Sequence, residues 1–230
     1  MNYQTLRSRM RGLLAMMLLA SLSPALKAES DETAIGLRAG HNNAFGGFAA
    51  VSVETSHTLS GIFSISGGLQ YSTIGKASVE ACPSFVFQRD WGTLSVETLL
   101  SYTSISSINS FAAGAGFSVD SKWAGGKIGY FYRTYGNQHG WINEPFNIFY
   151  DFRAHFLNKI DAWTLDFVIT NCERFELERH YQPSFILESK YYPTSRLGVA
   201  LGVGCKPAGV FNISAGYYQS YIKTGLIYRW

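Results

Sequence analysis

The sequence predicts an all-β protein: a single antiparallel transmembrane β-barrel of 12–14 strands that follows a cleaved signal peptide. Three observations lead to this fold class. From about residue 33 onward, apolar and polar side chains alternate at every second position, which is the period of a β-strand. No later stretch holds the ~18 uninterrupted apolar residues of a transmembrane helix. Aromatic residues make up 15% of the chain and there are 23 glycines, which suits the aromatic girdles and curved sheet of a barrel.

The last ten residues show this alternation clearly. One face carries Ile222, Thr224, Leu226, Tyr228 and Trp230, and the other carries Lys223, Gly225, Ile227 and Arg229. The segment resembles the closing strand of Gram-negative outer-membrane β-barrel proteins, which usually ends on an aromatic residue with a second aromatic two residues earlier. The resemblance implies the cell outer membrane as location, outer-membrane lipid as surroundings, and recognition by the barrel-assembly machinery through Ile222, Leu226, Tyr228 and Trp230. A soluble β-sandwich and a secreted surface protein remain alternatives.

The N-terminus has the layout of a secretory signal. Arg7, Arg9 and Arg11 precede an apolar run over residues 13–20, and small residues follow near Ala25 and Ala28. The run is too short to cross a bilayer as a helix. We therefore expect a signal peptide over residues 1–28 and one outer-membrane β-barrel over residues 29–230, with an N-terminal membrane anchor as the alternative.

Charge and cysteine content exclude several function classes. The formal net charge of +3 is too small to indicate nucleic-acid binding, and part of it belongs to the signal peptide. Cys82, Cys172 and Cys205 form an odd set, so at least one thiol has no partner within the chain. Their spacing does not resemble a metal site, and we expect no metal and no cofactor.

Strand-like alternation divides the mature chain into short segments separated by turns. Pro83 indicates a bulge within one segment, because proline cannot donate to the ladder. The charged stretch Asn171–Tyr181 fits either a loop or a strand over 174–181, and the longest connection is Thr134–Glu144. The segments predicted as strands are 33–42, 46–56, 60–72, 77–89, 93–104, 109–119, 123–133, 145–156, 161–170, 183–192, 196–205, 209–218 and 221–230.

Strand parity tests this division. Bacterial single-chain barrels have an even number of strands, and both ends normally lie in the periplasm, as the resemblance implies. Thirteen strands would leave the C-terminus outside, whereas counting 174–181 gives fourteen, which we favour slightly. Twelve is the alternative, if a weak strand belongs to a loop. A periplasmic start also places the Thr134–Glu144 connection outside, where longer loops are expected.

The charged side chains fall on the inward face. A turn near Leu157–Ile160 would place Asp151 opposite Asp166, and two opposed carboxylates need a cation between them. Lys127 would lie opposite Asp151 on the preceding strand if the long connection is centred on His139, and Arg153 lies one step along the same face. We therefore expect a Lys127–Asp151–Asp166–Arg153 cluster at mid-barrel, either as a charge-balanced wall or as a constriction that sets ion selectivity. The candidate lumen-lining residues are Lys127, Arg133, Asp151, Arg153, His155 and Asp166.

Catalytic patterns of outer-membrane enzymes do not appear in the sequence. Lipid hydrolases of this class use Ser and His two residues apart, and no histidine here has Ser at that spacing. The proteases use clustered Asp and His at the outer rim, for which His139, Asp151 and Asp166 are the nearest candidates. We expect the two aspartates to lie too deep.

The predicted function is therefore passive: a small-solute channel or a structural surface protein. The alternatives are a barrel enzyme acting on lipid or peptide and a secreted soluble all-β binding protein. Trp141 in the long connection belongs either to a binding loop or to the outer aromatic girdle.

Overall fold

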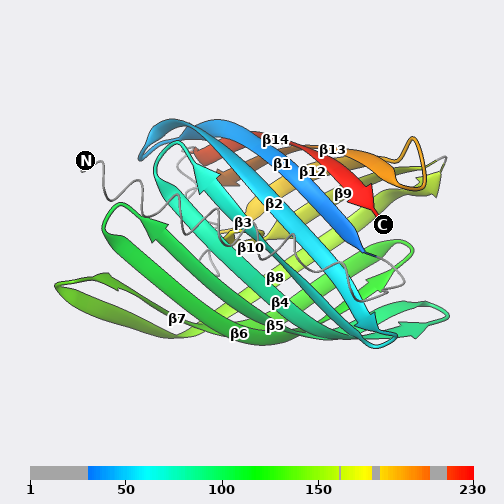
Figure 1. The fold of residues 1–230 in the computed structure, drawn as a ribbon, viewed down its shortest axis with the longest axis horizontal. Helices are drawn as coiled ribbons and strands as arrows, with labels where there is room; N and C mark the ends of the chain where they lie inside the picture. Colours follow the sequence, from blue (N-terminus) through cyan, green and yellow to red (C-terminus); the bar gives the residue numbers. More distant parts are fainter. Residues whose placement is uncertain (1–30, 161, 178–181, 208–216) are drawn as a thin grey trace.

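The computed structural model describes residues 31–160, 162–177, 182–207 and 217–230 (Figure 1). The predicted signal peptide, residues 1–28, lies outside these ranges. Within the described residues, no helix combines the length and the apolar character needed to cross a membrane.

Twelve antiparallel strands form one closed barrel in the described part of the chain. Within the barrel, strands that are consecutive in sequence are paired; in addition, β9 pairs directly with β12 and β1 pairs with β14. The barrel strands are β1 (Glu32–Asn42), β2 (Gly46–Ser60), β3 (Phe63–Ser72), β4 (Lys76–Arg89), β5 (Gly92–Ile105), β6 (Ile108–Ser121), β7 (Ala124–Asn137), β8 (Gly140–Ile160), β9 (Trp163–Thr170), β12 (Ser184–Tyr191), β13 (Leu197–Pro207) and β14 (Tyr217–Arg229). The two remaining strands, β10 (Cys172–Glu173) and β11 (Glu176–Leu177), form a separate small sheet.

The first and last strands close the barrel and bring both described ends to the same rim. Their register runs from Glu32 opposite Arg229 to Asn42 opposite Gln219. The Trp230 amide then donates to the Asp31 carbonyl at 2.9 Å. At the opposite end, the β7–β8 hairpin extends beyond the other strands (Figure 1).

The barrel wall is apolar outside and polar inside, the reverse of a water-soluble domain. Leu37 and Leu226 are 61% and 66% exposed on the outer face, whereas Arg38 and Asp151 are 7% and 8% exposed on the inner face. The outward positions predicted for the terminal strand are confirmed, because Ile222, Leu226, Tyr228 and Trp230 are all exposed. This alternation lets the closed sheet satisfy its backbone internally and face lipid.

Within the described residues the structure confirms the barrel and the alternative of twelve strands, so the preference for fourteen was wrong. Residues 172–177 of the charged stretch form the small β10–β11 sheet, and residues 178–181 lie outside the described ranges. Most of the predicted strand 209–218 lies outside the described residues; its last two residues, 217 and 218, belong to β14, which pairs directly with β13. Residues 208–216 are not described.

The predicted long connection Thr134–Glu144 is also wrong. β7 and β8 stay paired as far as Asn137 opposite Gly140, which leaves only Gln138 and His139 between the strands. A register shift between Phe131 and Arg133 interrupts the alternation of apolar and polar side chains. The sequence pattern therefore does not show that the strand continues. Trp141 therefore lies on a strand, opposite Gly136, and is exposed.

Glycines on the inner wall make room for a buried aromatic ring. Gly116 lies opposite Gly129, and Gly129 lies opposite Phe149, which is fully buried. A Cβ atom on Gly129 would lie 2.2 Å from Cζ of Phe149 and 2.5 Å from the Ala115 carbonyl oxygen. One of these two atoms, the Ala115 carbonyl oxygen, belongs to the backbone of the neighbouring strand. The strands themselves would therefore have to separate.

We expect Gly129→Ala to destabilise the barrel by about 1–3 kcal/mol, because the added methyl group overpacks the wall. The measurement is the temperature at which the folded, heat-modifiable gel band is lost. Gly47→Ala is the matched control, since a Cβ there has no heavy atom within 4 Å. Equal midpoints for the two variants would contradict this account.

Candidate functional site: a hairpin across the barrel lumen

The candidate site is built around the lumen hairpin, which we define as residues 171–177 including β10 and β11. It leaves the wall where β9 ends at Thr170. The fully buried side chain of Asn171 continues the ladder with β8: its Oδ1 accepts from the Tyr150 amide at 2.7 Å, and its Nδ2 donates to the Ile148 carbonyl at 2.8 Å. The base of the hairpin is thus fixed to the wall.

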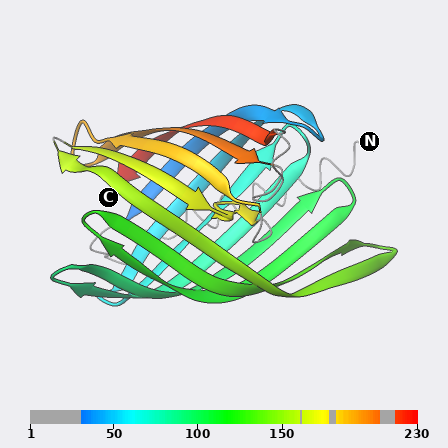
Figure 2. The same ribbon diagram turned by 180° about the vertical axis from the view of Figure 1, so that it is seen from behind.

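The hairpin crosses the lumen from one side to the other. Its base is at β9, and the residues that contact its tip come from β2, β3 and β4, which lie halfway round the ring of strands from β9. Figure 2 shows the short strands inside the barrel, with β9 and β12 in front and the first strands behind. A segment in this position narrows the lumen.

The tip of the hairpin, Phe175, is held by hydrogen bonds to its backbone. Phe175 has a φ of 64°, a conformation that costs a non-glycine residue of order 1 kcal/mol or more. Its amide donates to Oε1 of Glu80 at 2.6 Å, and its carbonyl accepts from Nζ of Lys76 at 3.1 Å. The ring lies against Gly68, where a Cβ would approach Cζ of Phe175 to 2.8 Å. These contacts offset the backbone strain and fix the tip to β3 and β4.

Two glutamates tie the hairpin to cations of the wall. Glu173 lies 3.4 Å from Arg38 and 3.6 Å from Lys223, and its carboxylate accepts from the Tyr221 hydroxyl. Glu176 contacts Lys206, Arg38 and Lys76. Burial by itself would raise the pKa of Glu176, but Lys206, Lys76 and Arg38 lower that pKa well below its usual value. Glu176 belongs to the hairpin and not to a membrane-spanning strand.

Arg174 projects between these glutamates and binds the opposite side of the barrel. Its Nε lies 3.3 Å from Oε2 of Glu54 on β2, and one terminal nitrogen lies 3.5 Å from the Ser66 hydroxyl on β3. Each charged side chain of the hairpin is therefore paired with wall residues of opposite sign.

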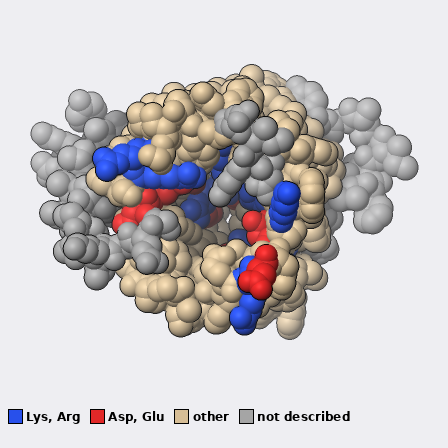
Figure 3. All heavy atoms as spheres, turned by 90° about the vertical axis from the view of Figure 1, so that its right-hand side faces the viewer, with Lys and Arg blue, Asp and Glu red and all other residues tan. Residues whose placement is uncertain are grey.

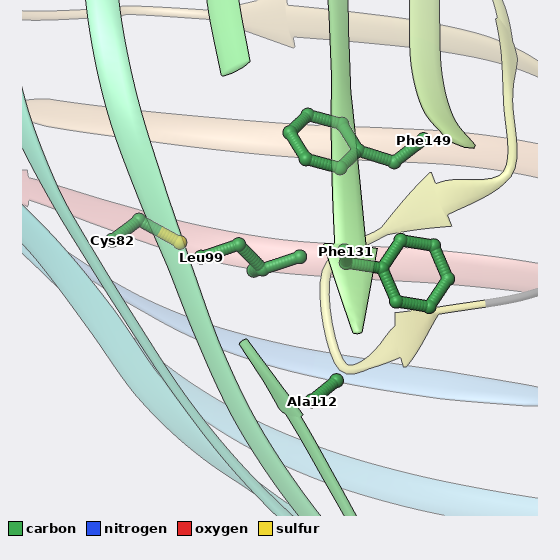
Figure 4. Packing of buried hydrophobic residues seen from close by; sticks show 5 residues of the cluster. All are labelled: Cys82, Leu99, Ala112, Phe131 and Phe149. Carbon is green, nitrogen blue, oxygen red and sulfur yellow. The ribbon is translucent and has the colours of Figure 1, made fainter. Parts of the chain in front are cut away.

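An apolar cluster supports one side of the hairpin. Cys82, Leu99, Ala112, Phe131 and Phe149 pack together on the inner wall (Figure 4), and Cys172 and Leu177 of the hairpin pack against them. Arg133 completes this side: it donates to the Leu177 carbonyl at 3.0 Å and pairs with Glu144. Cys82, Cys172 and Cys205 all carry free thiols.

The hairpin lies between two cavities, which we call the inner and the outer chamber. The inner chamber measures about 660 Å³ and reaches residues near the rim with both described chain ends, such as Glu32 and Asp120. The outer chamber measures about 230 Å³ and reaches the opposite end, at Phe45 and Ile74. Figure 3 shows the barrel end toward which the inner chamber extends. This end is hollowed and carries side chains of both charges.

Five of the predicted candidates, Lys127, Asp151, Arg153, His155 and Asp166, line the inner chamber, and Arg133 instead holds the hairpin. Lys127 does lie opposite Asp151, as the sequence predicted. Its ion pair, however, is with Glu97 at 2.9 Å, while Asp151 pairs with Arg153 at 2.8 Å.

The predicted opposition of Asp151 and Asp166 is wrong. β8 and β9 continue pairing past Leu157 to Ile160, through two register shifts, so that Asp166 faces His155 and Asp151 faces Thr170. His155 Nδ1 lies 2.7 Å from Asp166, and its Nε2 lies 3.0 Å from Asp120. The expected four-residue cluster is therefore divided into separate pairs.

Sequence reasoning missed the hairpin and its main partners outside the candidate set, Arg38, Lys76 and Lys206. The available signal was the dense charge of Glu173, Arg174 and Glu176 in a segment without strand alternation. Nothing local in the sequence relates these residues to cations on strands far away in the chain.

No family model matches the chain, and no curated protein matches it. Solved structures do match. The translocator domain of the autotransporter NalP from Neisseria meningitidis is 11% identical, with 99% of this chain and 97% of that chain covered and a TM-score of 0.56. The KdgM porin is 15% identical, with coverages of 85% and 98% and a TM-score of 0.53. The NanC porin is 13% identical, with coverages of 86% and 98% and a TM-score of 0.53. The chain thus has the fold of outer-membrane β-barrels.

We expect Glu176→Gln to loosen the hairpin, because the change leaves the buried Arg38 and Lys206 and the half-buried Lys76 without this carboxylate. Removing one partner of a buried ion pair costs about 3–5 kcal/mol. The readout is maleimide labelling of Cys172 in a Cys82→Ser, Cys205→Ser background, which should become several-fold faster. Asp166→Asn is the control, because it alters a wall pair that does not involve the hairpin. An unchanged labelling rate in Glu176→Gln would show that this carboxylate does not hold the hairpin.

The lowered pKa of Glu176 predicts how this contribution depends on pH. A carboxyl group whose pKa is lowered on folding stabilises fully above its unfolded pKa and loses that effect as pH falls through the folded value. The difference in thermal midpoint between the wild type and Glu176→Gln should therefore be the same at pH 7 and pH 5. A difference that already disappears at pH 5 would contradict this assignment.

Proposed function

We propose that this protein is an integral outer-membrane β-barrel that acts as a passive channel for small solutes, narrowed by the lumen hairpin. The observation that carries the proposal is the position of the hairpin. Its base is bonded to β8 through Asn171 and its tip to β4 through Phe175 and Glu80, on the other side of the barrel, and it leaves a chamber of about 660 Å³ on one side. The fold shared with the KdgM and NanC porins supports this reading.

The placement in the membrane follows from the barrel surface. The exposed apolar outer face suits lipid, and the shared rim of both described ends suits the periplasmic side, with the β7–β8 extension outside. In this scheme residues 1–28 are a signal peptide removed on export. The exposed outer face of β14, with Ile222, Leu226, Tyr228 and Trp230, is presented to the barrel-assembly machinery.

Charge balance in the inner chamber favours cations. Carboxylates outnumber Lys and Arg among its lining residues, so its wall carries a net negative formal charge even with His155 protonated. We assign ion selectivity to this lining, which includes Lys127, Asp151, Arg153, His155 and Asp166. The carboxylates are Glu32, Glu54, Glu80, Glu97, Asp120, Asp151, Asp166, Glu173 and Glu188, and the cations are Arg38, Lys127, Arg153, Arg174, Lys190 and Lys223.

A catalytic role is not supported by the histidine that faces this chamber. A general base needs a ring nitrogen free to take a proton from the reacting group. Both ring nitrogens of His155 contact carboxylates, one of Asp166 and one of Asp120. His139, the other predicted protease candidate, lies in the exposed β7–β8 turn, away from Asp151 and Asp166.

A structural surface protein is the second candidate function. The many ion pairs and hydrogen bonds of the hairpin favour it, because a divider held this firmly can close a lumen altogether. The two candidates differ in whether ions cross the folded barrel.

The refolded protein in a planar bilayer should show steady conductance. In a salt gradient, its reversal potential should indicate a preference for cations over anions. Lys127→Gln should increase that preference and Asp151→Asn should decrease it, since each removes one charge from the chamber wall. Arg89→Gln, at the exposed end of β4, is the control and should leave the reversal potential unchanged.

A variant with residues 172–177 replaced by a Gly-Ser linker should conduct several-fold more than the wild type. Its β-spectrum and heat-modifiable migration show whether the barrel has folded. Absence of conductance in folded wild type would exclude the channel and leave the structural role. Equal conductance with and without the hairpin would show that the hairpin does not narrow the path.

A further inference from the structure

Five of the polar side chains that line the outer chamber are deeply buried. Arg38, Asn42, Gln70, Ser72 and Gln219 all line it, and each is at most 7% exposed. Its volume of about 230 Å³ is below the ~300–1,000 Å³ usual for drug-sized ligands, so it fits a smaller solute.

Two of these side chains have unused hydrogen-bonding capacity. In the part of the chain that the structure describes, Oγ of Ser72 and Nε of Arg38 are buried and have no hydrogen-bond partner. An unpaired buried polar atom costs about 1–3 kcal/mol, so its persistence calls for a partner that is not part of the wall. Register puts both in one row, because Ala50 lies opposite Arg38 on one side and opposite Ser72 on the other. Ala50, whose side chain is small, also lines the chamber.

The rest of the wall offers amides and aromatic rings. Asn42 donates to Oε1 of Gln219 at 3.3 Å, and the two carboxamides together hold both donors and acceptors. Phe45 and Phe48 supply apolar surface, and Phe45 is 55% exposed at the mouth. A few fixed polar groups beside aromatic surface are the usual composition of a small-molecule site.

Charge at the floor of the chamber is already compensated. Arg38 and Lys76 line it, and both lie within 3.6 Å of Glu176, which lines it as well. A charged ligand would have to compete with these buried ion pairs, whereas an uncharged ligand would leave them intact.

We propose that the outer chamber binds an uncharged, hydroxyl-rich solute of about monosaccharide size. Its hydroxyl groups pair with Ser72, Arg38 and the carboxamides, and its carbon face packs on the phenyl rings. This inference deepens the proposed function by naming a class of solute. Equilibrium binding in detergent does not require conductance, so a channel that fails to bind and a binder that fails to conduct are distinguishable.

The test is isothermal titration of the full-length refolded protein with D-glucose as the probe, at an expected Kd on the order of 1 mM for so small a ligand. Ser72→Ala should weaken binding about 5–10-fold, because it removes one hydrogen-bonding hydroxyl. It should also leave the thermal midpoint equal or higher, since the lost hydroxyl was unpaired. Ser52→Ala is the matched control, because Ser52 is a lumen serine of the inner chamber and should leave binding unchanged.

A second variant tests the space between Arg38 and Ser72. Ala50→Leu should fill the chamber and abolish binding, whereas Ala49→Leu on the outer face of the same strand should not. Gluconate and glucosamine serve as anionic and cationic probes of similar size. Binding of a charged probe in preference to glucose would overturn the assigned class. Absence of glucose binding, or equal weakening in Ser52→Ala and Ser72→Ala, would overturn the site.

Discussion

The lumen architecture depends on the buried ion pairs between the hairpin and the wall. Glu176 draws together Lys206 of β13, Arg38 of β1 and Lys76 of β4, and Glu173 holds Arg38 from the other side. Each of these charges would be costly to bury alone, and removing any partner leaves the others uncompensated. The inward cations of these strands therefore need the acidic hairpin for charge compensation, and the hairpin glutamates need these cations. A lumen with this wall but without the hairpin would be a wetter, differently charged channel.

The outer surface of the barrel was predictable from the sequence, and the reason is local. Lipid demands an apolar side chain at every second position, so each strand carries its own signature whatever its partner. The number of strands was harder to predict than the outer surface. The rule that barrels have an even number of strands reveals only an odd number of miscounted strands. The predicted fourteen exceeds the twelve barrel strands of the described residues by two, so the sum stayed even. Of the two extra segments, residues 174–177 belong to the charged hairpin and residues 217–218 belong to β14.

Pairing within the lumen was only partly predictable. Lys127 opposite Asp151 follows from a hairpin turn close to the expected position, and it is observed. Asp166 faces His155 instead of Asp151, because β8 and β9 stay paired as far as Ile160 opposite Trp163, beyond the predicted turn, with two bulges along the way. Bulges of this kind leave little trace in a period-two pattern. The partners of Glu176 come from strands far apart in sequence, and closure of the barrel alone brings them together.

Under the proposed channel function, the position of the hairpin also determines where a solute is discriminated. It separates an ionic inner chamber from a smaller outer chamber lined by amides and phenyl rings. Arg38 and Gln70 line both chambers, so the boundary between them lies where β1 and β3 meet the hairpin. Arg38 is held there by Glu173 and Glu176 and lies 3.5 Å from the ring centre of Tyr221. A side chain fixed by so many partners presents the same surface to every solute. Discrimination therefore follows from the fit of the solute to a rigid boundary and needs no movement of the wall.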